Sequence, residues 1–329
     1  MKALIIGGGV AADIHARVLI GLGVDIACFC DLNINAGKTL AEKYNTLATD
    51  DIEKALKMDF DFGVVCTPSG THPSLAVKVM EAGRHVVVEK PLGLDPESCR
   101  LVAETEKKTG KICAPISQLR FSDTYRRVKA CLEREELGKL VTCSLSMKYH
   151  RSPEYYRGTW KGTKSMDGGE LMNQGIHGVD TMLGYLGKVK TVSGKVCTRF
   201  HDIEAEDTAV AHIVFEDGTL ATLDSSTALG YPCPRRLEIC GTKGMIVVEE
   251  DRVVFSSIEG LDIHSESNTN GNNDPANIGT DLHSLIYKNI LAAFEGKEKL
   301  EYGVGDALNT IELICAIYES SETSKAVEL

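Results

Sequence analysis

Short apolar runs recur along the first third of the chain and end in polar or turn-forming residues. After the first run, Ile14, Val18 and Leu22 keep the spacing of an amphipathic helix. Strands that alternate with helices favour a parallel sheet covered by helices on both faces, which is a doubly wound α/β arrangement. The expected strands span residues 2–6, 25–30, 62–66, 85–89 and 112–115.

The pattern changes near Gln118. A helix is expected over residues 123–136, and after it apolar residues alternate with polar ones, as in a sheet with one buried face. Asp217-Gly218 is a hairpin turn sequence, so neighbouring strands should pair antiparallel. We therefore predict an α/β domain of residues 1–118 and an α+β domain of residues 119–329 with a large, mostly antiparallel open sheet. Its strands are expected at residues 140–149, 190–198, 209–215, 219–226, 236–240 and 245–249.

The composition of the 329 residues limits the kinds of ligand that the chain takes. Acidic residues outnumber basic ones by 47 to 36, and the net charge of -11 disfavours nucleic acid and anionic membranes as partners. No apolar stretch approaches the roughly 20 residues that span a bilayer, and Met1-Lys2 leads directly into a strand. Eleven cysteines without a C-x-x-C pair indicate reduced thiols and no zinc site. We expect a soluble, cytoplasmic protein with a small-molecule ligand and no metal.

A glycine-rich turn follows the first predicted strand and precedes the first predicted helix. Gly7, Gly9 and Ala12 satisfy the G-x-G-x-x-A fingerprint of a Rossmann dinucleotide-binding unit. Gly7 allows the tight turn, Gly9 allows a pyrophosphate to approach, and Ala12 lets the helix pack on the sheet. Glycine turns without a ligand are also common, so this motif needs support from elsewhere in the chain.

That support comes from Asp31, which ends the second predicted strand about twenty residues beyond the glycines. A carboxylate at this position accepts hydrogen bonds from both ribose hydroxyls of an adenosine and repels a 2'-phosphate. No arginine follows Asp31 closely, so NAD is favoured over NADP. The alternative is a turn residue at a strand end.

Polar residues also follow two later strands of the predicted parallel sheet. Thr67, Pro68 and His72 come after one strand, and Glu89 and Lys90 end the apolar run of another. The carboxyl ends of parallel strands meet at the edge where open α/β sheets bind ligands. Lys90 is therefore a candidate reactive group, with a solvent-facing lysine as the alternative.

One helical segment in the second half carries three polar residues on one stripe. Asn173, His177 and Asp180 fall at positions i, i+4 and i+7. A histidine flanked by polar groups is available for acid-base chemistry. Without further context, however, a lone histidine is more often a packing residue.

Together, these motifs resemble the Gfo/Idh/MocA family of oxidoreductases. The resemblance rests on Gly7-x-Gly9-x-x-Ala12, Thr67-Pro68 with His72, Ala82-Gly83, Glu89-Lys90-Pro91, and the stripe of Asn173, His177 and Asp180. It implies that the Thr-Pro segment passes beside the cofactor, that Lys90 lies between nicotinamide and substrate, and that His177 acts in the chemistry. The predicted cofactor-binding residues are Gly7, Gly9, Val10, Ala11, Asp31, Thr67, Pro68, His72, Glu89, Lys90 and Gln118.

The residues expected at the substrate favour one branch of the family. The inositol dehydrogenase branch typically has aspartate where this chain has Asn173, which puts an inositol substrate in doubt. The run from Tyr155 to Trp160 is more similar to the branch that acts on nucleotide-linked amino sugars and uronic acids. Basic residues near this run either meet a carboxylate or diphosphate or form a solvated loop; they are Arg157, Lys161 and Lys164. The predicted substrate residues are Arg157, Trp160, Asn173 and His177.

The leading hypothesis is an NAD-dependent oxidoreductase that transfers a hydride to or from a ring hydroxyl or keto carbon of a sugar derivative. Either Lys90, with a pKa lowered beside nicotinamide, or His177, which titrates near neutral pH, handles the proton. A Glu89 carboxylate in direct contact with Lys90 would oppose the lowered pKa. The alternatives are a free-sugar or inositol-type dehydrogenase and a non-catalytic NAD-binding sensor, which would not need both residues.

Two features of the second half concern assembly and dynamics. An open sheet covered by helices on one face leaves the other face to be buried, so we expect a homodimer or homotetramer formed through the C-terminal sheet. A polar, solvated face is the alternative. The polar segment 265–280 is expected to be a mobile loop or a substrate lid.

Overall fold

The computed structural model describes residues 1–231, 233–259, 261 and 281–329. The segment 265–280, which the sequence suggests is a loop or lid, lies outside these residues. The chain forms two compact units. The first unit combines the described residues of Met1–Gln118 and Asp274–Leu308. The second combines those of Leu119–Asn273 and Asn309–Leu329.

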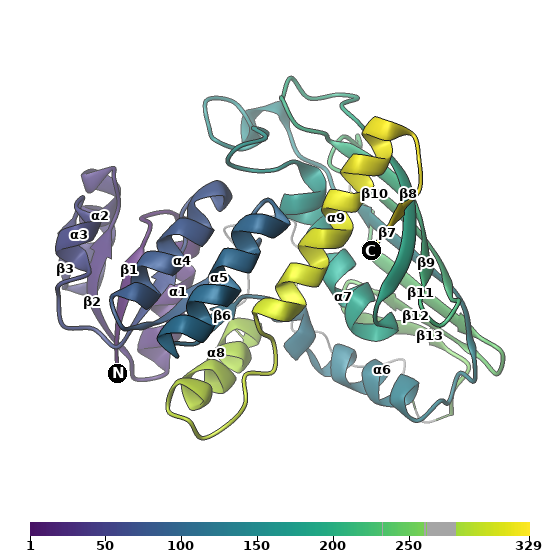
Figure 1. The fold of residues 1–329 in the computed structure, drawn as a ribbon, viewed down its shortest axis with the longest axis horizontal. Helices are drawn as coiled ribbons and strands as arrows, with labels where there is room; N and C mark the ends of the chain where they lie inside the picture. The colour runs from purple at the N-terminus through teal and green to yellow at the C-terminus, as the bar shows by residue number, and fades with distance from the viewer. Residues whose placement is uncertain (232, 260, 262–280) are drawn as a thin grey trace. The chain divides into compact units, whose positions relative to one another are not determined.

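The first unit is built on a six-stranded sheet with the strand order β3-β2-β1-β4-β5-β6 (Figure 1). Every neighbouring pair is parallel, and the order reverses between β1 and β4, which confirms the predicted doubly wound Rossmann arrangement. Ile5, Val64 and Val87 lie side by side across the sheet and are fully buried. The strands are β1 Lys2–Ile6, β2 Asp25–Cys30, β3 Leu47–Thr49, β4 Phe62–Val65, β5 His85–Val88 and β6 Cys113–Pro115.

Helices connect these strands, and several begin at residues whose side chains accept backbone N–H groups. Asn33, Asp51 and Asp95 cap helices in this way. The helices are α1 Val10–Gly21, α2 Ile34–Tyr44, α3 Ile52–Ala55, α4 His72–Glu81 and α5 Pro96–Thr109, with a 3₁₀ turn η1 at Ser69–Thr71. Helix α8, Asp281–Phe294, also belongs to this unit and packs on α1. The predicted division of the chain at residue 118 did not include this later segment in the first domain.

The second unit is built on an eight-stranded sheet with the order β13-β12-β11-β7-β10-β9-β8-β14. Its neighbours pair antiparallel except β7 and β10, which are parallel. The predicted mostly antiparallel sheet is confirmed, and the parallel pair arises because a long, helix-containing segment separates β7 from the strands that return beside it. The strands are β7 Leu140–Lys148, β8 Val189–Cys197, β9 Thr208–Phe215, β10 Leu220–Ser226, β11 Arg236–Gly241, β12 Met245–Glu249, β13 Arg252–Ser256 and β14 Val327–Glu328.

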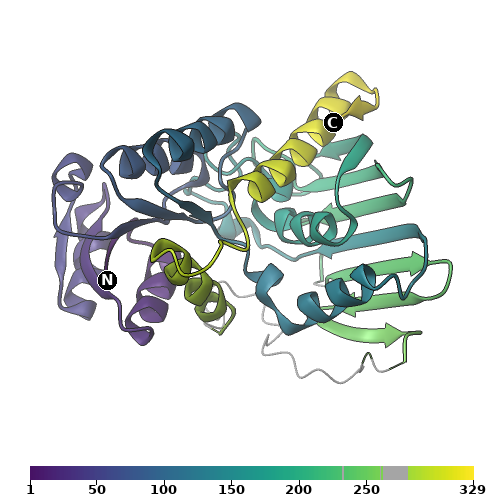
Figure 2. The ribbon, with the colours of Figure 1, turned by 60° about the horizontal axis from the view of Figure 1, so that its bottom comes forward.

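Helices lie on one side of this sheet (Figure 2). Cys143, Leu145 and Met147 of β7 face that side and are buried, and the residues between them are more exposed. The helical elements are η2 Gln118–Phe121, α6 Asp123–Glu133, η3 Pro153–Tyr155, η4 Leu171–Gly175, α7 Ile176–Leu186 and α9 Val304–Thr323, which begins in the first unit. No helix in the described part of the chain has the length and apolar character needed to cross a membrane.

Candidate active site

Three neighbouring strands of the first unit, β1, β4 and β5, end at the same edge of the parallel sheet. Gly7 follows β1, Thr67 lies just beyond β4, and Glu89 and Lys90 follow β5. The backbone N–H of Glu89 donates to Val65 O at 2.9 Å, so the ladder holds these ends in register. Most of the predicted cofactor-binding residues are therefore brought together along one edge.

The glycine turn has the geometry that a dinucleotide requires. Gly7 has a φ of +122°, and a Cβ there would lie 2.7 Å from Cys66 O, so only glycine fits. A Cβ on Gly9 would meet no atom of the described residues within 4 Å. Packing within the protein therefore does not explain Gly9, whereas the close approach of a pyrophosphate does. The first turn of α1, with Val10 and Ala11, has no side-chain cap on its N–H groups, which suits an anion.

Two polar side chains at the same edge retain hydrogen-bonding capacity. Asp31 follows β2, and its Oδ1 accepts the Asn33 N–H at 2.7 Å, while Oδ2 has no partner among the described residues. Gln118 follows β6, and its Oε1 is buried without a hydrogen-bond partner in the described part of the chain. A free carboxylate oxygen suits ribose hydroxyls, and an orphaned amide oxygen suits a ligand N–H. Both fit an NAD site.

His72 holds two of the loops at this edge. Its Nε2 lies 2.8 Å from Thr67 O and its Nδ1 lies 2.7 Å from Pro91 O, and the residue is 1% exposed. Burial lowers the pKa of His72 below its ordinary value. His72 therefore connects the Thr67-Pro68 loop to the segment that follows Lys90.

Glu89 is engaged on both oxygens. Oε1 lies 2.8 Å from His15 Nε2, and Oε2 accepts the backbone N–H of Lys90 at 3.0 Å. The carboxylate of Glu89 is therefore held by His15, a residue that the sequence analysis did not single out. The available signal was the position of His15 on the apolar face of α1, three residues before Val18 and seven before Leu22.

In the second unit, the predicted helix begins with one π-helical turn, η4, and continues as α7. Asn173 Nδ2 donates to Asp167 Oδ1, and Asn173 Oδ1 accepts Gln174 Nε2 at 3.0 Å. Gln174 Oε1 in turn accepts Arg151 Nη2 at 3.1 Å. This chain of contacts orders the turn that immediately precedes the half-buried His177.

Asp180, the third residue of the predicted stripe, has a structural role. Arg120 donates to both of its oxygens, with Nε to Oδ2 at 2.8 Å and Nη2 to Oδ1 at 2.9 Å. Thr310 Oγ1 also donates to Oδ1 at 3.1 Å, and Asp180 is 3% exposed. The buried pair anchors α7. Of the three residues of the stripe, Asp180 therefore supports the helix, and Asn173 and His177 remain as candidate site residues at its start.

The basic residues near Trp160 separate into two kinds. Arg157 is exposed, and its guanidinium lies 3.8 Å from the Glu154 carboxylate. Lys164 is also exposed, and Trp160 is half-buried. Lys161 is half-buried with its Nζ 3.7 Å from the centre of the Tyr155 ring. Burial lowers the pKa of Lys161, and nearby Asp167 offsets part of that effect.

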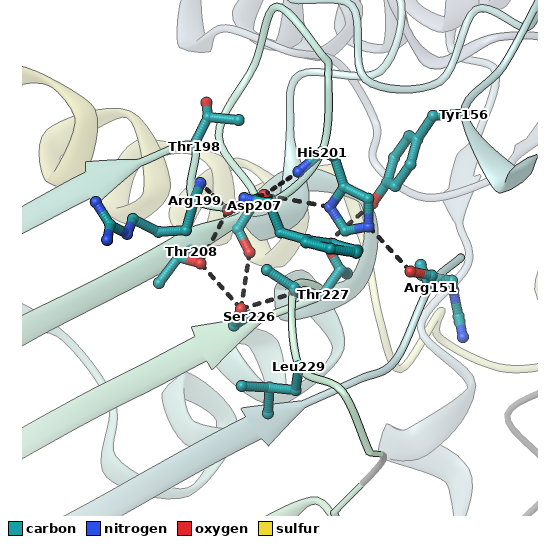
Figure 3. A network of polar contacts seen from close by, with 12 residues as sticks. Arg151, Tyr156, Thr198, Arg199, His201, Asp207, Thr208, Ser226, Thr227 and Leu229 are labelled. Atoms are coloured by element: carbon teal, nitrogen blue, oxygen red, sulfur yellow. Dashed lines mark hydrogen bonds and ion pairs between the residues drawn. The ribbon is translucent and has the colours of Figure 1, made fainter. Parts of the chain in front are cut away.

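A buried hydrogen-bond network holds the backbone of Arg151 (Figure 3). Asp207 accepts the backbone N–H groups of Arg199, Phe200 and His201. The His201 ring lies 3.2 Å from Asp207 Oδ2 through Nδ1 and 2.9 Å from Arg151 O through Nε2. The loop that holds Arg151 is therefore fixed by a carboxylate and imidazole that are themselves buried.

Two buried carboxyl groups that were not predicted lie at the start of the same helix: Glu170 precedes it in the chain, and Glu206 contacts it from a later segment. Ser225 Oγ donates to Glu170 Oε1 at 2.7 Å, and Glu206 Oε1 accepts Leu171 N at 2.9 Å and Tyr318 Oη at 2.9 Å. Burial raises the pKa of Glu206 to about 7 and that of Glu170 well above its ordinary value. Their signal in the sequence is weak, because isolated glutamates are usually surface residues.

Comparisons with known proteins agree with this fold. Residues 1–116 match the family described as "Oxidoreductase family, NAD-binding Rossmann fold", and residues 125–247 match "GFO/IDH/MocA C-terminal domain". The chain is 26% identical to D-glucoside 3-dehydrogenase of Escherichia coli (strain K12) over an alignment of 352 positions. The alignment covers 100% of this chain and 97% of that protein. It is 25% identical to scyllo-inositol 2-dehydrogenase (NAD(+)) of Bacillus subtilis (strain 168) over 267 residues, or 75% of this chain and 73% of that protein.

A solved structure is similar over the whole chain. It is the WlbA dehydrogenase from Bordetella pertussis in complex with NADH and UDP-GlcNAcA, with a TM-score of 0.91 and 26% identity. The similarity covers 100% of this chain and 97% of that one. Both sheets of the fold are therefore shared with an enzyme of known cofactor.

Proposed function

Because the chain belongs to the Gfo/Idh/MocA family of oxidoreductases, we propose that it transfers a hydride between NAD and a ring hydroxyl or keto carbon of a sugar derivative. The observation that carries this proposal is the shared edge of β1, β4 and β5, where the glycine turn and Lys90 follow strands of one sheet. NAD, when bound, supplies the hydride acceptor or donor. The Asp31 carboxylate, with one oxygen unpaired among the described residues, supports NAD rather than NADP, and the buried Gln118 amide oxygen supports a ligand at the same edge.

We propose that Lys90 and His177 handle the hydroxyl proton. Lys90 follows Glu89, whose two oxygens are engaged by His15 and by the backbone of Lys90. His177 follows an ordered turn, and an imidazole is a side chain that acid-base catalysis commonly uses. Each side chain suits either the direct base or a group that orients the hydroxyl, so both assignments are retained.

The substrate that the second unit supports best is an acidic or nucleotide-linked sugar. Lys161 is half-buried against Tyr155 and forms no ion pair with any described residue, which favours an anionic ligand group. The similar WlbA structure holds UDP-GlcNAcA, which supports the same class. Asn173 and Trp160 remain proposed substrate contacts, and Arg157, on the surface beside Glu154, is the weakest of the four.

An inositol-type or free-sugar dehydrogenase is the second candidate, because scyllo-inositol 2-dehydrogenase and D-glucoside 3-dehydrogenase are among the relatives. Asn173 weighs against inositol. A non-catalytic NAD sensor would not need the engaged Glu89 beside Lys90 or the ordered turn before His177.

We also propose that the enzyme works as a homodimer or homotetramer in the cytoplasm. The face of the second sheet that the helices leave uncovered exposes Val210 and Leu220 by about half, among polar residues such as Thr222. Burial of that mixed face in a subunit contact accounts for its apolar positions. All eleven cysteines are free, as a reducing compartment requires.

The test is a spectroscopic screen for NADH formation and consumption. Sugars, inositols, uronic acids and nucleotide-linked sugars are offered with NAD and, in parallel, with NADP. Turnover with a uronic acid or nucleotide-linked sugar and NAD supports the leading proposal, and turnover with inositol supports the alternative. NADH binding without turnover on any class leaves only the sensor.

A further inference from the structure

A buried histidine lies directly behind Glu89. His15, on α1, is fully buried, and its Nε2 lies 2.8 Å from Glu89 Oε1. Its Nδ1 lies 2.7 Å from the hydroxyl of Tyr287 on α8. The other oxygen of Glu89 accepts the backbone N–H of Lys90 at 3.0 Å. The carboxylate is thus fixed between the histidine and the backbone of the proposed catalytic lysine.

The two groups form an ion pair at neutral pH. Burial alone would lower the pKa of His15, but Cys66 and Glu89 beside the ring raise it, so the imidazole is protonated. Burial alone would raise the pKa of Glu89, but the hydrogen bond and charge of His15 lower it, with help from His283 and Lys90. The pair therefore carries no net charge.

The surroundings of the pair add no second carboxylate among the described residues. The titratable groups that face it are Cys66, His72, Lys90, His283 and Tyr287. Burial raises the pKa of Cys66 and of Tyr287. Among the described carboxylates, Glu89 is the one that contacts both His15 and the backbone of Lys90, and His15 balances its charge.

We propose that His15 is a positioning residue for the proton transfer assigned to Lys90; this rests on the function proposed above. His15 balances the charge of Glu89 and holds it on the backbone of Lys90. An ammonium group beside a balanced ion pair loses its proton more readily than one beside a free carboxylate. His15 thereby removes the opposition that Glu89 would otherwise offer to Lys90 as a base.

A purely structural role is the competing explanation, since the same contacts also tie α8 to α1. The two explanations differ in what removal of the charge does. Loss of a structural tie lowers stability and slows turnover equally at every pH. Loss of the charge balance moves the pH at which turnover falls, because a free Glu89 stabilises the protonated Lys90.

The test uses His15→Gln, which removes the charge but keeps a polar side chain, in the full-length protein. The acidic limb of the pH profile of kcat should move to higher pH by about one unit. At pH values on that limb, kcat should therefore fall about ten-fold. Adding Glu89→Gln removes the unbalanced carboxylate and should move the limb back. Tyr287→Phe, the matched control, removes a contact of the same histidine without changing charge and should leave the limb in place.

A second measurement needs no turnover. Competitive labelling with acetic anhydride, read by mass spectrometry, follows the pH at which Lys90 becomes reactive. Its midpoint should rise in His15→Gln and return in the double variant. An unchanged Lys90 midpoint in folded His15→Gln would overturn the proposal. If no sugar is oxidised by the wild type, the proposed function fails, and labelling still decides the effect of His15 on Lys90.

Discussion

Lys161 holds its Nζ 3.7 Å from the centre of the Tyr155 ring, half-buried and without an ion pair among the described residues. The ring face stabilises the cation only in part, so an incoming anion would gain both a charge partner and a desolvated site. We predict that Lys161→Met raises KM for an acidic sugar about ten-fold and changes kcat little, the usual size of one charge-assisted hydrogen bond. Steady-state kinetics measure both values.

The matched control is Lys164→Met, three residues further on and exposed. It should leave KM unchanged. Equal effects of the two substitutions would mean that only the general positive charge of the segment matters, and no effect of either would exclude Lys161 from the substrate site.

Gly7 and Gly9 should respond differently to alanine. Gly7→Ala places a Cβ against Cys66 O at a positive φ, so it should lower the free energy of unfolding by roughly 2 kcal/mol or more. Gly9→Ala meets no atom in the described part of the chain, so stability should hold while the Kd for NADH rises. Urea unfolding and NADH fluorescence titration separate the two. Unchanged NADH affinity in Gly9→Ala would argue against a pyrophosphate at this turn.

The fold was largely readable from the chain because strand and helix spacing are local signals. Alternation of apolar runs with amphipathic helices predicted the parallel sheet, and alternating residues predicted the second one. The partners of Glu89 could not be read in this way. Tyr287 lies 272 residues from His15, and helix α8 returns to the first unit after most of the second has been built. No local pattern encodes that contact.

In the candidate site, too, some residues could be predicted from the sequence and others could not. Gly7 and Asp31 were found because dinucleotide binding imposes a fixed spacing on a single strand-helix-strand unit. Asp180 was grouped with His177 by helical periodicity, but periodicity does not reveal that Arg120 takes up its carboxylate. Lys161 and Arg157 were indistinguishable by type, and only burial separates them.

The buried pair of Arg120 and Asp180 predicts that stability and chemistry can be separated on one helix. Asp180→Asn leaves the Arg120 charge uncompensated, so it should cost about 3 to 5 kcal/mol of stability, as broken buried ion pairs do. His177→Ala should leave the urea midpoint near that of the wild type and remove turnover instead. Loss of stability in His177→Ala with normal turnover per folded molecule would reverse these roles.

Glu206 predicts a pH dependence of stability. Burial raises its pKa in the folded state to about 7 from an ordinary value of 4.5. Between these values only the folded state keeps the proton, so rising pH favours unfolding. The cost should reach about 3 kcal/mol near pH 7, at 1.36 kcal/mol per pKa unit, and then level off.

Urea midpoints between pH 4.5 and 8 check this dependence. Glu206→Gln cannot release a proton and should flatten the fall, whereas Glu216→Gln, an exposed change in the same unit, should not. A wild-type midpoint that rises with pH over this range would contradict a buried, protonated Glu206.

The central claim is that this oxidoreductase uses Lys90 and His177 to move the substrate proton. The most direct measurement compares NADH formation from the best sugar substrate by the wild type, Lys90→Ala and His177→Ala, with NADH affinity measured in each. Both substitutions should slow turnover roughly 100-fold or more and leave NADH affinity unchanged, as expected for lost acid-base catalysis. Wild-type turnover in both variants would contradict the account.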